Sequence, residues 1–384
     1  MNGIVFFNGL LSMTPADFAG YMQFGFTALA ILGVLVIAHE FGHFIVARMV
    51  GVPVEKFSVG FGRKIYGKKV GETEYMVCLV PLGGYVKFYG DDPDEEKKEP
   101  TAHDGYSFFT EPVWKRLAIV AAGPIFNLIL AVFIYTAAAM IGWPEMPDIN
   151  AGQTMPAVMD EVLPNEPAHK AGVRPGDTVV AVNGIATPNW ESFREHIVKS
   201  PNVAVTLSVV RPDGGKEDII VTPKEEKRTD LDGKVKSVGL IGVAPKGLVV
   251  SYPPHIALVK GVEKTVYMTG LTVWVIGKLI TRDIPANQIT GPIGIMQIGG
   301  QAAERGVVYL LMLVGFISVN LAVVNLMPIP VLDGGHIFFF SIEAIIGKPL
   351  SMRHQEIAQH IGLIMILSLM VLAFYNDFVR IFAG

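Results

Sequence analysis

The sequence predicts a polytopic α-helical membrane protein that also carries a mainly-β domain outside the bilayer. Of its 384 residues, 51% are hydrophobic and only 17% are charged, whereas about 25% of the residues of an ordinary soluble protein are charged. Four segments with almost no charge approach the ~20 residues that a bilayer-spanning helix needs. A further, polar segment shows the short apolar runs and turn residues of a β domain.

Four transmembrane helices are predicted from the nearly charge-free segments. They cover residues 19–49, 113–144, 306–332 and 357–380. Residues 252–305 do not qualify as a fifth span. The apolar run in the first half of this region is interrupted by charged side chains. These charges are Lys260, Glu263, Lys264 and Lys278. We therefore expect an amphipathic juxtamembrane region there.

Lys and Arg in the short loops predict the orientation of the spans. The loop at 50–112 carries eight of them, whereas the C-terminal tail carries Arg380 alone. The loop at 50–112 is therefore expected in the cytoplasm, and the large polar region at 145–305 and both tails are expected outside it. Because no Lys or Arg precedes Arg48, the first apolar run is interpreted as a retained span and not as a cleaved signal peptide.

The cytoplasmic loop contains a segment that is too apolar for solvent. Residues 56–89 are rich in Gly, β-branched and aromatic residues, which predicts strands with turns at Gly67 and Gly71 and a bend at 81–84. We expect a β-hairpin that re-enters the membrane. The charge run that begins at Asp91 predicts a solvated linker.

Residues 150–247 predict the mainly-β domain, of about one hundred residues. A turn at 171–177 precedes a strand over 178–184 that ends in Asn-Gly, which favours a tight hairpin turn. A helix and two further strands are expected after it, at 189–199, 203–210 and 217–222.

The first span contains the chemically most informative stretch, His39-Glu40-Phe41-Gly42-His43, with the pattern H-E-x-x-H. On a helix the two histidines lie on one face. Neutral imidazoles placed in this way can bind Zn²⁺ at about 2.0–2.1 Å, while the glutamate activates a water molecule. Ionisable residues at membrane depth are costly and are therefore functional candidates. The alternative is a polar cluster that packs one helix on another.

A third ligand is predicted from the topology. The first and third spans both run inward, so Asp333 arrives at a depth similar to that of His39 and His43. Two imidazoles and one carboxylate leave a fourth position for water, which is the pattern of catalytic zinc. A cysteine cage and an internal disulfide are excluded, because Cys78 is the single cysteine. The alternative role of Asp333 is that of a turn residue before two glycines.

Further polar residues accompany these ligands. Pro328 and Pro330 open the third span, and broken helix at membrane depth is tolerated where it lines a cavity. Asn325 could bind an oxyanion or a substrate strand, whereas Asn320 has a bridge between helices as its alternative. The substrate-binding candidates are Asn325, Asn320, Gly83, Gly84 and Tyr85. Small residues and an amide over 123–127 indicate a close helix contact in the second span.

Three motifs resemble those of the site-2 protease family of intramembrane zinc metalloproteases, and most closely its bacterial RseP-type members. They are HEFGH in the first span, GPIFN in the second and NLMPIPVLDGG at 325–335. The resemblance covers nearly the whole chain, including PLGGYVKF and GPIGI. AGVRPGDTVVAVNG, at 171–184, resembles PDZ domains of bacterial proteases. Some members carry two such domains in tandem, and the sequence indicates one here.

The resemblance implies a zinc metalloendopeptidase. His39, His43 and Asp333 would bind Zn²⁺, Glu40 would be the general base, and Asn325 would contact substrate. The implied substrate is a pre-cleaved single-span membrane protein, such as an anti-sigma factor or a remnant signal peptide, cut within its transmembrane segment. The implied location is the bacterial plasma (inner) membrane. The N-terminus and the PDZ-like domain would be extracytoplasmic, with the active site near the cytoplasmic side. The PDZ-like domain would bind a peptide or a substrate ectodomain.

Two other classes of function stay open. A membrane metal transporter would need a polar path across the whole bilayer, yet the outer halves of the first and third spans have no ionisable residue. A PDZ-bearing scaffold with a relic site is the second alternative, and the activity of a Glu40 variant separates it from a protease. A net charge of -4 gives no indication of a nucleic-acid partner.

Overall fold

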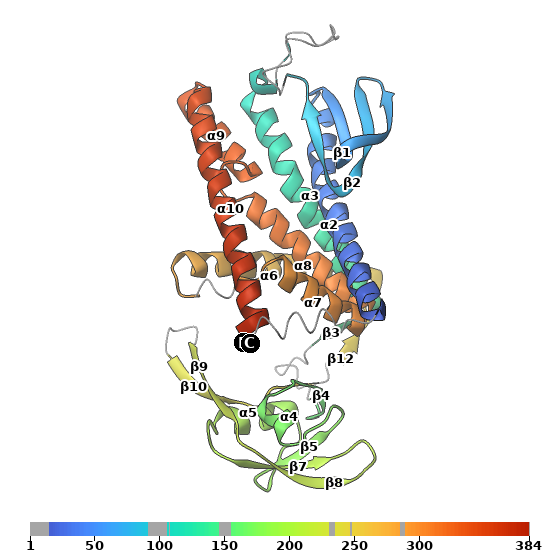
Figure 1. Cartoon of the computed structure of the whole chain (residues 1–384), viewed down its shortest axis with the longest axis vertical. Coiled ribbons are helices and arrows are strands. Elements are labelled where there is room, and N and C mark those ends of the chain that lie inside the picture. The colour runs from blue at the N-terminus through green and yellow to red at the C-terminus, as the bar shows by residue number, and fades with distance from the viewer. Residues whose placement is uncertain are drawn as a thin grey trace. The chain divides into compact units, whose positions relative to one another are not determined.

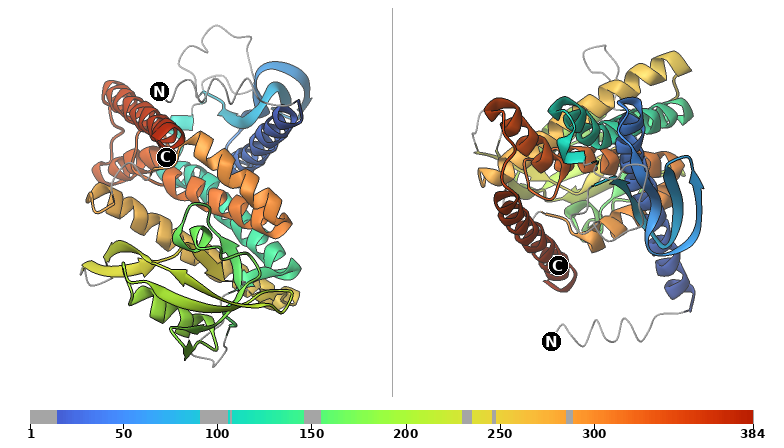
Figure 2. Two further views of the ribbon diagram at one scale, coloured as in Figure 1. Left: turned by 60° about the horizontal axis from the view of Figure 1, so that its bottom comes forward. Right: turned by 90° about the horizontal axis from the view of Figure 1, so that it is seen from above.

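The chain divides into two compact units, Met1–Ile141 together with Ser251–Gly384, and Gly142–Val250 (Figures 1 and 2). The computed structural model describes residues 15–90, 106, 108–145, 155–229, 235–245, 248–284 and 289–383. The linker predicted from Asp91 onward lies outside these ranges. We describe the two units separately.

The first unit is a helical bundle with α3 at its centre, since α3 packs against α2, α6, α8 and α9 (Figure 1). Its described helices are α2 (Pro15–Met49), η2 (Phe108–Thr110), α3 (Val113–Ile141), α6 (Pro254–Ile280), α7 (Pro292–Arg305), α8 (Val307–Asn325), α9 (Asp333–Ile346) and α10 (Met352–Ala383). Four of the described helices are long and apolar enough to cross a membrane, namely α2, α3, α8 and α10.

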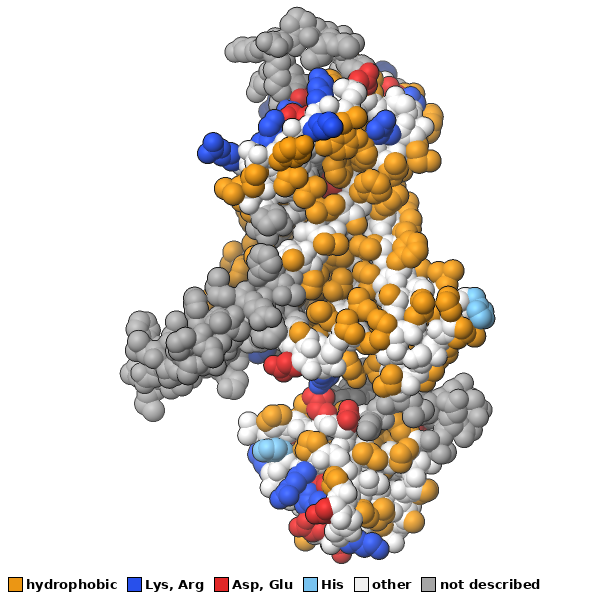
Figure 3. Space-filling view, turned by 90° about the vertical axis from the view of Figure 1, so that its right-hand side faces the viewer, with side chains coloured by type: hydrophobic (Ala, Val, Ile, Leu, Met, Phe, Trp, Pro, Cys, Tyr) orange, Lys and Arg blue, Asp and Glu red, His pale blue; other side chains and the backbone are white. Residues whose placement is uncertain are grey.

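The outer faces of these helices are apolar although they are exposed. Val34 of α2, Phe133 of α3 and Val371 of α10 are 58%, 64% and 70% exposed. On the face that Figure 3 shows, hydrophobic side chains cover much of the helical part, and Lys and Arg gather at its end that carries β1 and β2. An apolar surface of this extent fits contact with lipid.

Two predicted spans extend beyond the helices that form there. Helix α8 ends at Asn325 and not at residue 332, because Pro328 and Pro330 cannot donate the backbone hydrogen bonds that would continue it. Helix α3 ends at Ile141, and the residues after Gly142, at φ 125°, form a strand. The region 252–305 divides into two helices, α6 and α7.

The predicted hairpin is the antiparallel pair β1 (Val54–Val70) and β2 (Thr73–Phe88). The early part of β1, residues 54–59, lies between two parts of β2 and pairs with residues 84–88 on one side and 74–77 on the other. Residues 84–88 have no second strand partner among the described residues, so they form an edge of this sheet.

Glycines set the bends of the hairpin. Gly60 and Gly62 have φ values of 91° and 87°, and Gly83 has a φ of 117°, all in the region that favours glycine. Gly71 begins the turn between β1 and β2, as predicted. The turn predicted at Gly67 is wrong, because Gly67 lies inside β1 and pairs with Met76.

The second unit is mainly β, and its central sheet has the strand order β6-β5-β7-β8. These strands are β5 (Thr178–Val182), β6 (Ile185–Ala186), β7 (Val205–Val210) and β8 (Lys216–Val221). The other pairs are β3 (Trp143–Glu145) with β12 (Leu248–Val250), β4 (Met159–Val162) with β11 (Val243–Pro245), and β9 (Lys224–Thr229) with β10 (Val235–Leu240). Asn183 and Gly184, both at positive φ, form the turn between β5 and β6.

Two short helices complete the second unit, α4 (Pro167–Lys170) and α5 (Trp190–Val198). The side chain of Asn189 caps α5 by accepting a hydrogen bond from the Ser192 N–H at 2.9 Å, which satisfies a donor that the helix leaves free. The alternating burial along β7 places Leu207 in the core against Phe193 of α5. This core is separate from that of the helical unit.

Candidate metal centre

Helix α2 places His39 and His43 one turn apart on its buried face. Their side chains are buried, and the two rings meet edge to face at a centroid distance of 4.8 Å. The Nε2 atoms of the two rings lie 3.2 Å apart. Two buried nitrogens that face each other at this distance are arranged to share a third partner.

Helix α3 contacts the opposite nitrogen of each ring. The Nδ1 atom of His43 lies 2.8 Å from the carbonyl oxygen of Ile119, and Nδ1 of His39 lies 3.2 Å from Nδ2 of Asn127. A carbonyl oxygen can only accept a hydrogen bond, so Nδ1 of His43 carries the proton and Nε2 keeps its lone pair. His43 is therefore held in the tautomer that can bind a metal through Nε2.

Glycines allow α2 and α3 to approach this closely. A methyl group on Gly123 of α3 would collide with the Nε2 atoms of both His43 and His39. A methyl group on Gly42, between the two histidines, would collide with the backbone of Ala122. The small residues of both motifs thus bring the α3 backbone into contact with the imidazoles.

The connection from α8 to α9 delivers the carboxylate. Leu332 closes a tight turn by donating its N–H to the carbonyl oxygen of Ile329 at 3.0 Å. Val331 has a φ of 95°, a conformation that β-branched residues rarely adopt. Gly334 and Gly335 pack against the backbone of this loop so closely that neither has room for a side chain. The loop and the two glycines fix the start of α9, which is Asp333.

Asp333 meets the two histidines through one oxygen atom. Its Oδ2 lies 2.9 Å from Nε2 of His39 and 3.5 Å from Nε2 of His43. This oxygen is buried, and the two imidazole nitrogens that face it can satisfy it either as protonated donors or through a shared cation. A buried oxygen in this state has a high cost unless a cation or a donor satisfies it.

The three side chains fit a zinc ion. Their ligand atoms all lie within 4.8 Å of one another, and among the described residues they form a candidate metal-binding group. Two imidazole nitrogens and one carboxylate oxygen are a donor set that zinc accepts in catalytic sites. The three residues that the sequence predicted at a similar depth thus lie together in space.

Glu40 lies on the side of α2 that faces β2. Its carboxylate interacts electrostatically with His43, His39 and Asp333 and accepts a hydrogen bond from the backbone of Val86. A methyl group on Gly84 would come within 3.8 Å of Glu40 Cγ. The glutamate therefore lies between the three candidate ligand side chains and the edge of the β1–β2 sheet.

The candidates for substrate binding lie in different surroundings. Gly83 and Gly84 are buried against α2, and Tyr85 stacks on Phe61 within the hairpin. Asn325 is the last residue of α8 and is half-buried. Asn320 bonds to α6 instead, since its Oδ1 accepts a hydrogen bond from Thr272 at 3.3 Å. This contact matches the bridge between helices that was its alternative role.

Two residues near the centre were not singled out from the sequence. His336 lies one turn after Asp333 on α9 and interacts electrostatically with Asp333 and His43. Its spacing of three from Asp333 on a helix is the signal that points to it. Ile119 acts through a backbone carbonyl, which no side-chain pattern indicates.

Comparison with known proteins connects this geometry to a family. A model of Peptidase family M50 matches residues 27–369. The chain belongs to this family.

Named relatives of this family M50 chain share most of its length. The "Regulator of sigma-E protease RseP" of Escherichia coli is 33% identical over 92% of this chain and 98% of that protein. The "Protease RseP" of Yersinia pestis is also 33% identical, over 92% and 98% of the two chains. The "Putative zinc metalloprotease Atu1380" of Agrobacterium fabrum is 37% identical over 91% and 94%.

Membership of family M50 identifies the chain as a membrane metalloprotease and confirms the resemblance drawn from its motifs. The four described helices of membrane length agree with a multi-pass protein. The sequence prediction of an enzyme of the zinc metalloprotease class is thereby confirmed.

Proposed function

We propose that the protein is an intramembrane zinc metalloprotease that hydrolyses a peptide bond within the transmembrane segment of a single-span membrane protein. The observation that supports this proposal most directly is the convergence of His39, His43 and Asp333, from helices α2 and α9, on one buried point. Ionisable residues gathered inside a membrane bundle are retained for function.

Each of these side chains has a distinct role in the proposed reaction. Zn²⁺ held by the two histidines and Asp333 would act as a Lewis acid and lower the pKa of water to about 7. Glu40 would take a proton from the attacking water and return it to the leaving amine. Glu40 is half-buried beside β2, a position that would keep its carboxylate next to both the proposed ligands and an approaching chain.

The edge of the hairpin supports a route for binding the substrate. A helical transmembrane segment shields its peptide bonds and must unwind before it can be cut. Residues 84–88 form a sheet edge beside Glu40, and an extended chain can add to such an edge through backbone hydrogen bonds. We infer that Gly83, Gly84 and Tyr85 contact the unwound substrate and that Asn325 orients it.

The proposed topology follows the distribution of positive charge. The hairpin is rich in Lys and Arg, which favours a cytoplasmic position for β1, β2 and the nearby metal centre. The N-terminus and residues 142–250 would be extracytoplasmic.

We propose the bacterial plasma membrane as the location and regulated intramembrane proteolysis as the process. Relatives named for sigma-E regulation support a regulatory substrate such as a pre-cleaved anti-sigma factor. A remnant signal peptide is the second candidate.

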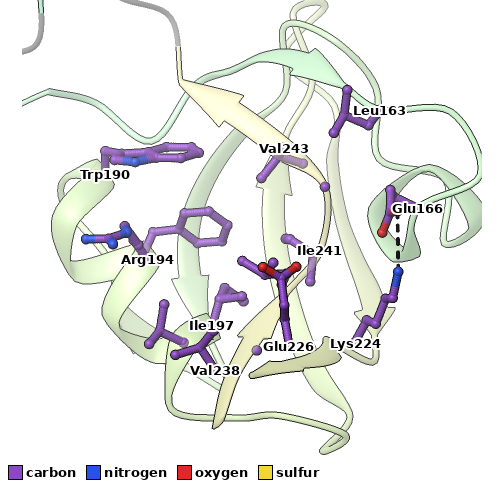
Figure 4. Close-up of a pocket in the computed structure, with 15 residues that line it drawn as sticks. Leu163, Glu166, Trp190, Arg194, Ile197, Lys224, Glu226, Val238, Ile241 and Val243 are labelled. Atoms are coloured by element: carbon purple, nitrogen blue, oxygen red, sulfur yellow. Dashed lines mark ion pairs between the residues drawn. The ribbon is translucent and has the colours of Figure 1, made fainter. Parts of the chain in front are cut away.

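We further propose that the second unit is a single PDZ-like domain that binds a peptide or a substrate ectodomain. Helix α5 and the segment 238–243 enclose a cavity of about 430 Å³, within the range of natural ligand pockets. Figure 4 shows Trp190 and Ile197 on one side of the cavity and Ile241 on the other. Its walls are mainly apolar, with the Lys224–Glu166 ion pair near one end.

Zinc content and cleavage, measured together, test the catalytic proposal. The wild type, Glu40→Gln and Asp333→Asn are purified in detergent and mixed with a model transmembrane peptide. We expect about one zinc and cleavage for the wild type, zinc without cleavage for Glu40→Gln, and loss of both for Asp333→Asn. Cleavage by Glu40→Gln would refute the assigned base, and full zinc in Asp333→Asn would place the third ligand elsewhere.

Peptide selection tests the proposed PDZ-like domain. The full-length protein in detergent is used to enrich a peptide library displayed on phage. We expect Val238→Asp, which puts a charge into the apolar cavity, to abolish the enrichment seen with the wild type. Val203→Asp, at a 58% exposed position of the same unit, is the control. Equal enrichment by all three proteins would contradict the proposed peptide site.

A further inference from the structure

Asn127 of α3 lies beside Nδ1 of His39, the ring nitrogen that points away from Asp333. The side chain is fully buried, and its amide contacts the His39 ring with Nδ2 placed 3.2 Å from Nδ1. The other amide atom, Oδ1, is buried and has no hydrogen-bond partner among the described residues. Among the described residues, the hydrogen-bonding neighbour of this amide is therefore the ring of His39, a candidate metal ligand.

The two histidines receive matching partners from one ridge of α3. Ile119, Gly123 and Asn127 follow one another at a spacing of four, the same spacing that separates His39 from His43 on α2. Residues at this spacing form the ridges by which helices pack. Along this ridge the Ile119 carbonyl oxygen faces His43 and the Asn127 amide faces His39. Gly123, which has no side chain, lies against both rings.

The protonated nitrogen of the His39 ring determines whether the Asn127 amide must donate or accept a hydrogen bond. A neutral imidazole that offers Nε2 to a metal carries its proton on Nδ1, and that proton needs an acceptor. Ile119 O is such an acceptor for His43. For His39 the group in place is the amide, whose oxygen and nitrogen exchange positions when it turns by a half rotation.

We propose that Asn127 is a positioning residue of the metal centre, with Oδ1 accepting the Nδ1 proton of His39 and so directing its Nε2 lone pair toward the metal. The inference rests on the metal site proposed above. The backbone of Asn127 is held in place, because the buried Ser318 of α8 donates a hydrogen bond to the Asn127 carbonyl oxygen at 2.8 Å. Partners of this kind typically contribute 10–100-fold to metal affinity.

Zinc affinity tests this role without reference to turnover. The full-length wild type, Asn127→Asp and Asn127→Leu compete for zinc with a chelator of known affinity in detergent. We expect Asn127→Leu, of similar size but without an acceptor, to bind zinc roughly 10–100-fold more weakly. Asn127→Asp keeps an acceptor and is expected to retain the wild-type affinity. Thr136→Val, on the same helix, serves as the packing control.

Each outcome of this experiment has a meaning. Unchanged affinity in Asn127→Leu would overturn the proposal, and so would an equal loss in Asn127→Asp, because the group needed would then be a donor. A wild type that binds no zinc would refute the proposed function itself and is therefore distinguishable.

A spectroscopic measurement decides the case if Asn127→Leu does not fold. Protein labelled with ¹⁵N at histidine reports which ring nitrogen carries the proton, and a His39→Gln variant assigns the signal. In the metal-free wild type we expect the His39 proton on Nδ1. A proton on Nε2 would overturn the proposal.

Discussion

Arg116 and Glu343 are 227 residues apart in the chain and form a two-pronged ion pair between α3 and α9. The Arg116 Nη1 and Nη2 atoms donate to the Glu343 carboxylate at 3.0 Å and 2.5 Å. The guanidinium also lies 4.6 Å from the centre of the Phe340 ring. Because α9 begins at Asp333, this pair fixes the far end of the helix that carries the proposed carboxylate ligand.

We predict that Arg116→Leu lowers both the unfolding temperature and the zinc affinity of the protein. The substitution leaves the Glu343 carboxylate largely buried without its partner, which typically costs 3–5 kcal/mol. The double variant Arg116→Leu/Glu343→Leu should recover part of the loss, since no charge then stays unpaired. Thermal unfolding in detergent, with zinc titration, measures both effects.

The exposed pair Lys64–Glu74 is the control for Arg116, because such pairs contribute about 0–1 kcal/mol. Lys64→Ala should leave the unfolding temperature nearly unchanged. A double variant at Arg116 and Glu343 that is as unstable as Arg116→Leu would show that the unpaired charge is not the cause.

Gly123→Ala should greatly reduce zinc binding. The added methyl group would collide with the Nε2 atoms of His43 and His39, so the imidazoles or α3 would have to move. The control is Gly270→Ala in α6, where a methyl group would meet nothing within 4 Å and where alanine favours the helix by about 1 kcal/mol. Chelator competition measures the affinity, and equal affinities would mean that α3 can shift without cost to the site.

Metal removal should destabilise the wild type. An ion that binds the native state alone stabilises it by about 2.7 kcal/mol at a free concentration one hundred times its Kd. We expect a chelator to lower the unfolding temperature of the wild type and of Glu40→Gln. The same chelator should have little effect on a His39→Ala/His43→Ala variant. A similar drop in that variant would indicate that the metal binds elsewhere.

Asp377→Ala should loosen α10 from α7. The buried Asp377 carboxylate accepts hydrogen bonds from the N–H groups of Gly291, Ile293 and Gly294 at 2.9–3.1 Å, which caps the start of α7. Loss of these acceptors should lower the unfolding temperature, with Asp377→Asn intermediate. Asp283→Ala, at an exposed position, is the comparison. An unchanged unfolding temperature in Asp377→Ala would show that the cap contributes little.

Features within one segment of the sequence were sufficient to predict the long apolar helices and one tight turn. Charge-free length predicted α2, α3, α8 and α10, and the Asn183-Gly184 pair predicted the turn after β5. The H-E-x-x-H spacing placed His39 and His43 on one face of a helix. The depth expected for the first and third spans, both predicted to run inward, indicated that Asp333 would lie near them, and its carboxylate does lie beside both imidazoles.

Contacts between distant parts of the chain left no such signal. Nothing near Arg116 or Asp377 in the sequence indicates the partners that each finds in another helix. Pro328 and Pro330 indicated an opening of the third span, but the end of that span was set by hydropathy alone at residue 332, beyond the end of α8 at Asn325. The bend at Gly60 and Gly62 was missed for a similar reason, since composition does not show which glycine takes a positive φ.

The bare backbone at Gly123 has a consequence for inhibitors. Gly123 closes the α3 side of both imidazoles, so a hydroxamate or another group that binds the proposed metal would have to enter from the side where Glu40 faces β2. A compound that carries its bulk toward β2 should fit, and one that extends toward α3 should not. Selectivity among compounds would then depend on the hairpin residues that a backbone-mimicking inhibitor reaches first.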